Sequence, residues 1–348
     1  MLAAVLYGQE DLRLETVPDP EPGMGEIVIA VGAATTCGTD LKVWRRGGHA
    51  RMLKPPTLFG HEAAGTIVAL GEGVQGWNIG DRVVANNSAP CGQCFFCKRQ
   101  EYSLCQDLLF NNGTFAPLLK IPAPIVEQNL LPIPEGLSFE MAAMTEPLAC
   151  VLHGVARSNT KPGDRVLLMG DGAIGLMFVA ALASGFSLSA PPSEIIVVGG
   201  SPARLEVAKQ LGATHTYLHR EVTDLPALTR KHTENWGADI VIEATGLPTA
   251  WETAIACGRP GATINLFGGC PKNTTITVNT EQLHYNELTL KGVFHNTPTF
   301  VRSALAFINS GQAPLELLIS GQAPLSELGR VFEEMRDRKV IKVAMVPD

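Results

Sequence analysis

The chain has 348 residues, a length that suggests two domains. Hydrophobic residues make up 45% and charged residues 18%, which is the balance of a folded protein and excludes wholesale disorder. The formal net charge is -7, so no basic surface is expected to bind a phosphate backbone, and we predict no nucleic-acid partner.

The amino terminus predicts where the protein works. It has no basic segment followed by a long apolar segment, and no stretch of the chain approaches the roughly 18 apolar residues of a membrane span. We therefore expect no membrane association and a cytoplasmic location, where thiols stay reduced.

The first 150 residues predict a compact β-barrel. Three strands are expected at 26–31, 64–70 and 81–85. Glycine and proline separate these strands at short intervals, as they do in small barrels.

From about residue 161 the pattern changes to alternating strands and helices. Apolar runs predict strands at 165–169, 194–198, 239–243 and 262–267, with helices such as 174–184 and 203–211 between them. This alternation indicates βαβ units and a parallel sheet. The segment 287–293 is expected as an edge strand, and after residue 300 the chain predicts two helices and a strand at 339–343.

Four cysteines lie within fifteen residues and predict a metal site. They are Cys91, Cys94, Cys97 and Cys105. A gap of two residues lets neighbouring sulfurs converge on one tetrahedral ion, and four protein ligands leave no open position, so the spacing predicts a structural zinc. An iron–sulfur cluster is the alternative, although nothing else in the chain indicates electron transfer.

A second set of residues carries a family resemblance. Cys37 lies in Cys-Gly-Thr-Asp, His61 and Glu62 lie in Gly-His-Glu-x-x-Gly, and Glu146 lies in Glu-Pro-Leu-Ala-Cys. Together with the four-cysteine segment, the Gly-His-Glu motif followed by Gly71 and Val74 resembles the signature of zinc-containing medium-chain alcohol dehydrogenases. The other two motifs resemble the polyol, glucose and threonine dehydrogenase branch of that family.

The resemblance implies an α/β fold in three segments. A GroES-like β-barrel catalytic domain would cover 1–153, and a Rossmann domain with a doubly wound parallel sheet would cover 154–290. Residues 291–348 would return to the catalytic domain. Relatives are dimers or tetramers, so a homodimer or homotetramer is expected.

The resemblance also implies a catalytic zinc, which makes two zinc ions per chain. Cys37, His61 and Glu146 would hold this ion, Glu62 would be a neighbour or an exchanging ligand, and Thr39 would take the proton from the alcohol. Such a ligand set leaves zinc electrophilic. Cys150 is the alternative third ligand. Relatives carry histidine where this chain has Lys42, so the proton could leave through Lys42, His49 or water.

The glycine-rich turn after the strand at 165–169 predicts a dinucleotide site. It reads Gly170-Asp171-Gly172-Ala173-Ile174-Gly175 and opens an apolar helix, which is the context that gives this motif its meaning. Gly170 would form the turn, Gly172 would let the pyrophosphate approach the backbone, and Gly175 would allow close packing. Ala173 and Ile174 would place helix N–H groups near the phosphates.

The end of the next strand predicts which cofactor binds. In a site that binds NAD, an acidic residue at the end of this strand accepts a hydrogen bond from the ribose 2′-hydroxyl. Neither Asp nor Glu stands in the loop that follows Val198. Gly200 leaves room, and Ser201 and Arg204 offer donors to a phosphate, as in the Gly-Ser-x-x-Arg arrangement of NADP-using relatives. We therefore predict NADP(H) over NAD(H), unless Arg204 only covers a solvated helix face. Later loops are expected by position to hold the nicotinamide, through Thr245, Phe267, Gly268, Phe294 and His295.

These features predict an oxidoreductase that transfers a hydride between a secondary alcohol and the nicotinamide cofactor. The alcohol would be a polyol, sugar, cyclitol or amino alcohol. Alternatives are oxidation of a 3-hydroxy amino acid such as threonine, and reduction of a biosynthetic ketone or aldehyde. A zinc-free quinone reductase or a non-enzymatic NADP-sensing protein would not need the cysteine motifs. The substrate pocket is expected to draw on Trp44, Arg45, Arg46, Phe59 and residues 110–120.

Overall fold

The chain crosses between two compact units more than once. A computed structural model of the protein describes residues 1–49 and 51–347. The first unit comprises 1–149, 296–310 and 318–348, and the second comprises 150–295 and 311–317. Among the described residues, no helix combines the length and the apolar character needed to cross a membrane.

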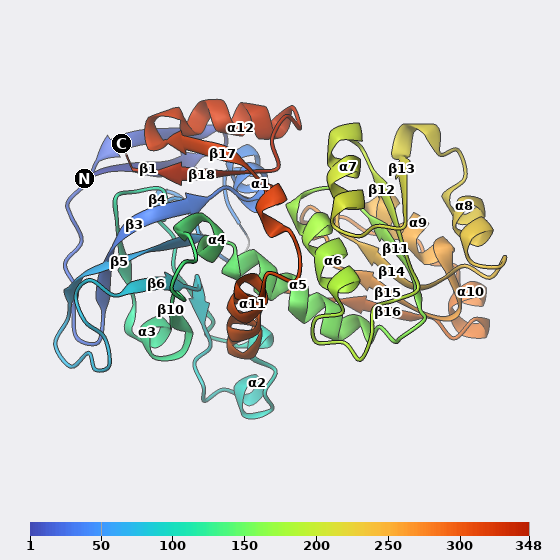
Figure 1. Cartoon of the computed structure of the whole chain (residues 1–348), viewed down its shortest axis with the longest axis horizontal. Coiled ribbons are helices and arrows are strands. Elements are labelled where there is room, and N and C mark those ends of the chain that lie inside the picture. The colour runs from blue at the N-terminus through green and yellow to red at the C-terminus, as the bar shows by residue number, and fades with distance from the viewer. Residues whose placement is uncertain (50, 348) are drawn as a thin grey trace. The chain divides into compact units, whose positions relative to one another are not determined.

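The first unit is built mainly from antiparallel strands (Figure 1). Its strands are β1 (Leu2–Gly8), β2 (Asp11–Thr16), β3 (Ile27–Thr35), β4 (Thr57–Leu58), β5 (Ala63–Leu70), β6 (Arg82–Ala85), β7 (Ser88–Ala89), β8 (Leu109–Phe110), β9 (Leu118–Ile121), β10 (Leu130–Pro132), β17 (Ile319–Pro324) and β18 (Lys342–Val346). Its helices are α1 (Gly38–Arg46), α2 (Phe95–Lys98), α3 (Ala123–Asn129), α4 (Phe139–Ala143), α11 (Pro298–Ser310) and α12 (Leu328–Arg336).

The largest sheet of this unit joins both ends of the chain. Its strand order is β10-β6-β5-β3-β18-β17, and β9 also pairs with β3. Ala34 of β3 pairs with Ala63 of β5, while Thr35 of β3 pairs with Ala344 of β18. The residues just after β3, just before β5 and at the start of β18 therefore meet at one end of the sheet.

An aromatic core fixes the helices that face this sheet. The ring of Phe332 on α12 lies 6.1 Å from Phe59 and 6.3 Å from Phe115, and Trp44 on α1 lies 5.8 Å from Phe332. Phe59 and Phe115 are at most 1% exposed, so these rings belong to the buried apolar core of the unit.

The second unit is a Rossmann fold. Six parallel strands stand in the order β13-β12-β11-β14-β15-β16. They are β11 (Arg165–Met169), β12 (Glu194–Gly199), β13 (His215–Leu218), β14 (Ala238–Glu243), β15 (Gly258–Leu266) and β16 (Thr289–Gly292). The helices are α6 (Ala173–Ser184), α7 (Pro202–Gln210), α8 (Leu225–His232), α9 (Pro248–Cys257) and α10 (Thr280–Tyr285), and α5 (Thr145–Ser158) contributes residues to both units. Figure 1 shows α6 and α7 on one side of the sheet and α8 and α9 on the other.

The predicted order of strands and helices is observed, and the strand after residue 287 lies at the edge of its sheet, as predicted. One prediction needs correction. The last strand runs from Lys342 to Val346 and not over the predicted 339–343. Arg338 adopts a left-handed conformation (φ 60°) after the end of α12, so the chain needs several residues before it becomes extended.

Candidate zinc and dinucleotide sites

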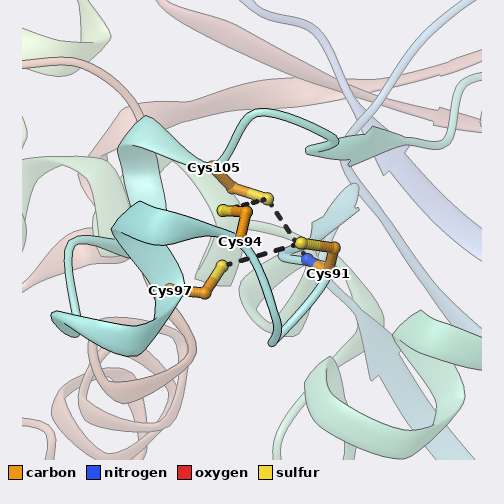
Figure 2. Close-up of side chains that lie close together, drawn as sticks. All are labelled: Cys91, Cys94, Cys97 and Cys105. Atoms are coloured by element: carbon orange, nitrogen blue, oxygen red, sulfur yellow. Dashed lines mark hydrogen bonds between the residues drawn. The ribbon is translucent and has the colours of Figure 1, made fainter.

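The four clustered cysteines converge as their spacing predicts. Figure 2 shows the four side chains turned toward one another, and their sulfur atoms all lie within 4.8 Å of one another. The Sγ atoms of Cys91 and Cys97 are 4.0 Å apart, as are those of Cys94 and Cys105. Ligand sulfurs at about 2.3 Å from a tetrahedral zinc would be about 3.8 Å apart. The donor set therefore fits one zinc ion with no open position.

The surroundings of these thiols differ. The backbone N–H groups of Cys97 and Gln106 lower the pKa of Cys94 to about 6, whereas burial raises the pKa of Cys97 to about 12. Burial also raises the pKa of Cys105. A bound cation would offset the cost of several thiolates in one place.

A second potential metal site lies at the end of the β3–β5 sheet. Cys37, His61 and Glu62 are at most 6% exposed and offer ligand atoms within 4.8 Å of one another. Cys37 is the N-cap of α1, where its sulfur accepts a hydrogen bond from the N–H of Thr39 at 3.4 Å. Glu62 Oε1 is buried without a hydrogen-bond partner. An orphaned carboxylate oxygen beside a thiol and an imidazole is a donor set that fits zinc.

Asp40 is a residue of this site to which the sequence assigned no role. Its Oδ1 lies 2.9 Å from His61 Nδ1, and its Oδ2 accepts the N–H of Cys37 at 2.9 Å. Burial disfavours a charged imidazole, but the Asp40 carboxylate outweighs it and raises the pKa of His61 well above the ordinary value. A carboxylate at Nδ1 leaves Nε2 as the ligand atom, which is the usual arrangement behind a metal-binding histidine.

Lys342 is a second residue of this site that no sequence motif predicts. Its Nζ donates to Glu62 Oε2 at 2.6 Å and to the carbonyl of Thr36 at 2.8 Å, and the hydroxyl of Thr35 donates to the same carboxylate oxygen. Lys342 and Glu62 are fully buried. The ammonium thus holds the Glu62 carboxylate in one orientation, with Oε1 as the remaining acceptor.

Glu146, the predicted third ligand, lies outside the group formed by Cys37, His61 and Glu62. It begins α5 and is 6% exposed. Its Oε1 lies 3.4 Å from Nδ2 of Asn296, which also pairs with the amide of Asn86 at 3.2 Å. The structure therefore brings three of the four predicted catalytic-zinc residues together and holds Glu146 through Asn296.

The other residues predicted around the catalytic zinc are placed as follows. Cys150 belongs to the second unit, and its Sγ lies 4.0 Å from Nδ1 of His295. His49 Nδ1 accepts the N–H groups of Arg51 and Met52, and burial lowers its pKa. Lys42 lies half-buried on α1.

The predicted substrate pocket needs a correction at Phe59. This side chain is 0% exposed and packs into the aromatic core against Phe115 and Phe332. It is therefore part of the core that supports the site. Arg45 and Arg46 are exposed near the end of α1, where cations complement the helix dipole.

Most of the predicted cofactor residues lie in the loops that follow parallel strands, at one edge of the second sheet, whereas Arg204 lies on α7. The glycine turn follows β11, Gly200 and Ser201 follow β12, Thr245 follows β14, and Phe267 with Gly268 follows β15. Phe294 and His295 come two and three residues after β16. Dinucleotides bind at the carboxyl ends of such strands.

The three glycines of the turn play separate roles. Gly170 has a φ of 119°, which side chains rarely adopt, and a Cβ on Gly175 would lie 2.0 Å from the carbonyl oxygen of Gly170. A Cβ on Gly172, the N-cap of α6, would meet nothing within 4 Å. The open space at Gly172 and the N-terminus of α6 together fit a pyrophosphate.

Two carboxylates support these loops, and the sequence motifs predict a role for neither. Glu243, 0% exposed, accepts the N–H of Thr245 at 2.7 Å and that of Gly246 at 3.1 Å. Asp171, 6% exposed, accepts the N–H of Gly200 at 2.8 Å and that of Ser201 at 2.7 Å. An acid at the end of a buried strand, as Glu243 is, or between the glycines of the turn, as Asp171 is, is the signal that could have found them.

Comparison with known proteins agrees with this architecture. The family model for the alcohol dehydrogenase GroES-like domain matches residues 23–135, and the model for zinc-binding dehydrogenases matches residues 173–310. Sorbitol dehydrogenase of Bacillus subtilis (strain 168) is 33% identical over 356 aligned positions, which cover 100% of this chain and 98% of the relative. The chain belongs to the zinc-dependent medium-chain alcohol dehydrogenase family.

Further similarities extend over the full length of this dehydrogenase. A probable D-xylulose reductase A of Aspergillus clavatus is 31% identical, with 98% of this chain and 95% of the relative covered. The crystal structure of a putative zinc-binding dehydrogenase from Sinorhizobium meliloti 1021 bound to NADP superposes with a TM-score of 0.89 at 26% identity, over 99% of each chain. This dehydrogenase is therefore an oxidoreductase of alcohols with the predicted GroES-like and Rossmann folds.

Proposed function

We propose that this dehydrogenase oxidises a secondary hydroxyl of a polyol and passes the hydride to a nicotinamide dinucleotide. The observation that carries the proposal is the buried group of Cys37, His61 and Glu62 in a chain whose relatives include a sorbitol dehydrogenase and a probable xylulose reductase. Oxidation of a 3-hydroxy amino acid is not favoured by these relatives.

Zinc at the Cys37 group would polarise the substrate oxygen and lower the pKa of the bound alcohol. Asp40 would keep Nε2 of His61 directed at the ion, and Lys342 would hold Glu62 so that only Oε1 faces it. Thr39, two residues after Cys37 in the first turn of α1, is the proposed acceptor of the alcohol proton, and His49, Lys42 or water is proposed to pass it on.

The third protein ligand is proposed to be one of two carboxylates. Glu146 matches the family position, while Glu62 lies with Cys37 and His61. Glu62→Gln and Glu146→Gln separate them by zinc content and turnover, because only the variant of the true ligand should lose the catalytic ion. Cys37→Ser should lose that ion in either case.

Two zinc ions per chain are proposed, one at the Cys37 group and one at the four cysteines. Metal analysis of Cys97→Ser should find about one zinc per chain fewer than the parent protein. Cys257→Ser is the matched control, since Cys257 is a buried thiol of α9 outside both groups. A protein purified without zinc would contradict the proposal.

Hydride transfer is tested by nicotinamide absorbance with a panel of sorbitol, xylitol, other polyols, sugars and threonine. Polyols are expected to be oxidised fastest. Faster turnover of threonine, or of simple primary alcohols, would overturn the substrate class.

The choice between the two dinucleotides depends on the loop after β12. Gly200, Ser201 and Arg204 favour the predicted preference for NADP(H), whereas the Asp171 carboxylate opposes it.

We also propose that the protein is a homodimer or homotetramer and works in a reducing, cytoplasmic environment. Light scattering measures the oligomeric state. The edge strand β16 is the proposed pairing surface.

A further inference from the structure

The acid that is absent after β12 is replaced from another loop. In dinucleotide sites that bind NAD, a carboxylate at the end of the second strand accepts the ribose 2′-hydroxyl. Here Gly199 ends that strand, and Asp171 reaches it from the glycine turn after β11. Its Oδ2 accepts the backbone N–H groups of Gly200 at 2.8 Å and Ser201 at 2.7 Å.

Gly199 leaves the space that Asp171 fills. A Cβ at residue 199 would lie 2.6 Å from Cβ, Cγ and Oδ2 of Asp171. Its φ is outside the left-handed range, so the backbone does not require glycine. Glycine is therefore required at 199 because the Asp171 side chain occupies the space that a side chain at the end of β12 would fill.

We propose that Asp171 is the specificity-determining residue of the cofactor site and makes this dehydrogenase select NAD(H) over NADP(H). The inference rests on the proposed function as a nicotinamide-dependent enzyme. It reverses the preference predicted from Ser201 and Arg204, because the acid that the sequence lacks in this loop is supplied by the first loop.

Charge and hydrogen bonding act in the same direction. Asp171 is 6% exposed, so its negative charge is screened little by solvent. It already occupies two N–H groups at the start of α7, which an incoming phosphate would otherwise use. A 2′-phosphate would meet a carboxylate in place of those donors, whereas a 2′-hydroxyl would find an acceptor in the second carboxylate oxygen, Oδ1. Arg204 offers a cation to a phosphate but cannot restore the two donors.

The direct test measures the dissociation constants of NADH and NADPH by titration calorimetry on the full-length, zinc-loaded protein at fixed ionic strength. The parent protein is expected to bind NADH at least about tenfold more tightly than NADPH. Asp171→Asn keeps an oxygen that can accept both N–H groups but removes the charge. It should move the affinity ratio toward NADPH by at least about tenfold.

Asp224→Asn is the matched control. Asp224 also accepts a backbone N–H at the start of a helix of the same unit, from Ala227 at 2.8 Å, but it caps α8. Its substitution should leave the ratio unchanged. A purely structural role of Asp171 would lower both affinities or the melting temperature and leave their ratio unchanged, which would overturn the proposal.

An exchange of positions gives the second test. Asp171→Gly should lose the preference for NADH, and Asp171→Gly combined with Gly199→Asp should regain it. Glycine is chosen at 171 because a Cβ there would lie 2.6 Å from the new Cβ at 199. A parent protein that binds NADPH more tightly, or a double variant that stays without preference, would overturn the proposal. Binding of neither dinucleotide would overturn the proposed function itself.

Discussion

Lys342 and Glu62 place opposite charges at two positions where side-chain exposure does not exceed 1%. A buried pair gives little net stability against apolar residues of the same size, but removal of one partner leaves the other charge uncompensated. Lys342 therefore supplies the counter-charge that offsets the cost of burying the Glu62 carboxylate next to Cys37 and His61.

Lys342→Met is expected to lower the free energy of unfolding by about 3–5 kcal/mol, because Glu62 stays buried without a counter-charge. Urea unfolding monitored by circular dichroism measures this. Lys120→Met is the control, since the Lys120–Glu26 pair is partly exposed to solvent and about 0–1 kcal/mol is expected. The double variant Lys342→Met with Glu62→Gln should recover part of the lost stability. Equal losses in Lys342→Met and Lys120→Met would contradict this role of Lys342.

His153 gives the stability a defined pH dependence. Burial lowers its pKa below the ordinary value, and its Nδ1 lies 2.8 Å from the carbonyl oxygen of His295. The imidazole of the unfolded chain takes up a proton near pH 6.5, whereas that of the folded chain takes it up only at lower pH. The contribution of His153 to the free energy of unfolding is therefore present above pH 6.5 and is lost as the pH falls toward the folded pKa.

His153→Gln should therefore flatten the fall in stability between pH 7 and pH 5, by at most about 1.4 kcal/mol per pH unit. Chemical unfolding at several pH values measures the slope. The control is His284→Gln, at an exposed histidine of α10. A slope that steepens in the His153 variant would show that the folded state takes up the proton more readily than the unfolded chain.

At the scale of the element, the turn between β11 and α6 separates packing from ligand approach. A Cβ on Gly175 would lie 2.0 Å from a backbone oxygen that cannot move away without distorting the turn, whereas a Cβ on Gly172 would point into open space. Substitution of Gly175 should therefore lower stability, whereas substitution of Gly172 should mainly weaken dinucleotide binding.

Gly175→Ala is expected to cost about 1–3 kcal/mol of stability and to weaken dinucleotide binding. Gly172→Ala should cost no more than about 1 kcal/mol as an N-cap change, yet weaken NADH binding by itself, because the methyl group would stand where the proposed site admits the pyrophosphate. Melting temperatures and NADH titrations of both variants distinguish the two effects. Tight NADH binding by Gly172→Ala would show that the phosphates lie elsewhere.

Elements and local motifs were predictable from the sequence because their signals are local. The spacing of Cys91 to Cys105 and the periodicity of the βαβ units are determined by neighbours in the chain. Asp171, Asp40 and Lys342 were missed because each acts on a residue that the fold brings near. The reach of Asp171 across to Gly200 depends on parallel pairing of β11 with β12, and that of Lys342 on pairing of β18 with β3.

At the scale of the whole molecule, the proposed metal and dinucleotide groups belong to different units. Both metal groups, Cys37 with its neighbours and the four cysteines, lie within 1–149, and the loops of the glycine turn, Gly200 and Thr245 lie within 150–295. Removal of metal should therefore abolish turnover without abolishing cofactor binding.

Zinc removal with a chelator is expected to leave the dissociation constant of NADH within about threefold of its original value while turnover falls below detection. Titration calorimetry and absorbance assays on the same sample measure the two quantities, and readdition of zinc is the control. Loss of NADH binding together with turnover would show that the dinucleotide site depends on the metal.

The pairing of β18 with β3 also has a consequence for synthesis. Lys342 reaches the Thr36 carbonyl and Glu62 across separations of 306 and 280 residues. A ribosome delivers β3, Cys37, His61 and the whole parallel sheet before it delivers that lysine, and domains fold as they emerge. The Glu62 carboxylate therefore has no counter-charge until 280 further residues have been made. A chain released before Lys342 would contain every proposed metal ligand and still lack the cation that lets one of them be buried.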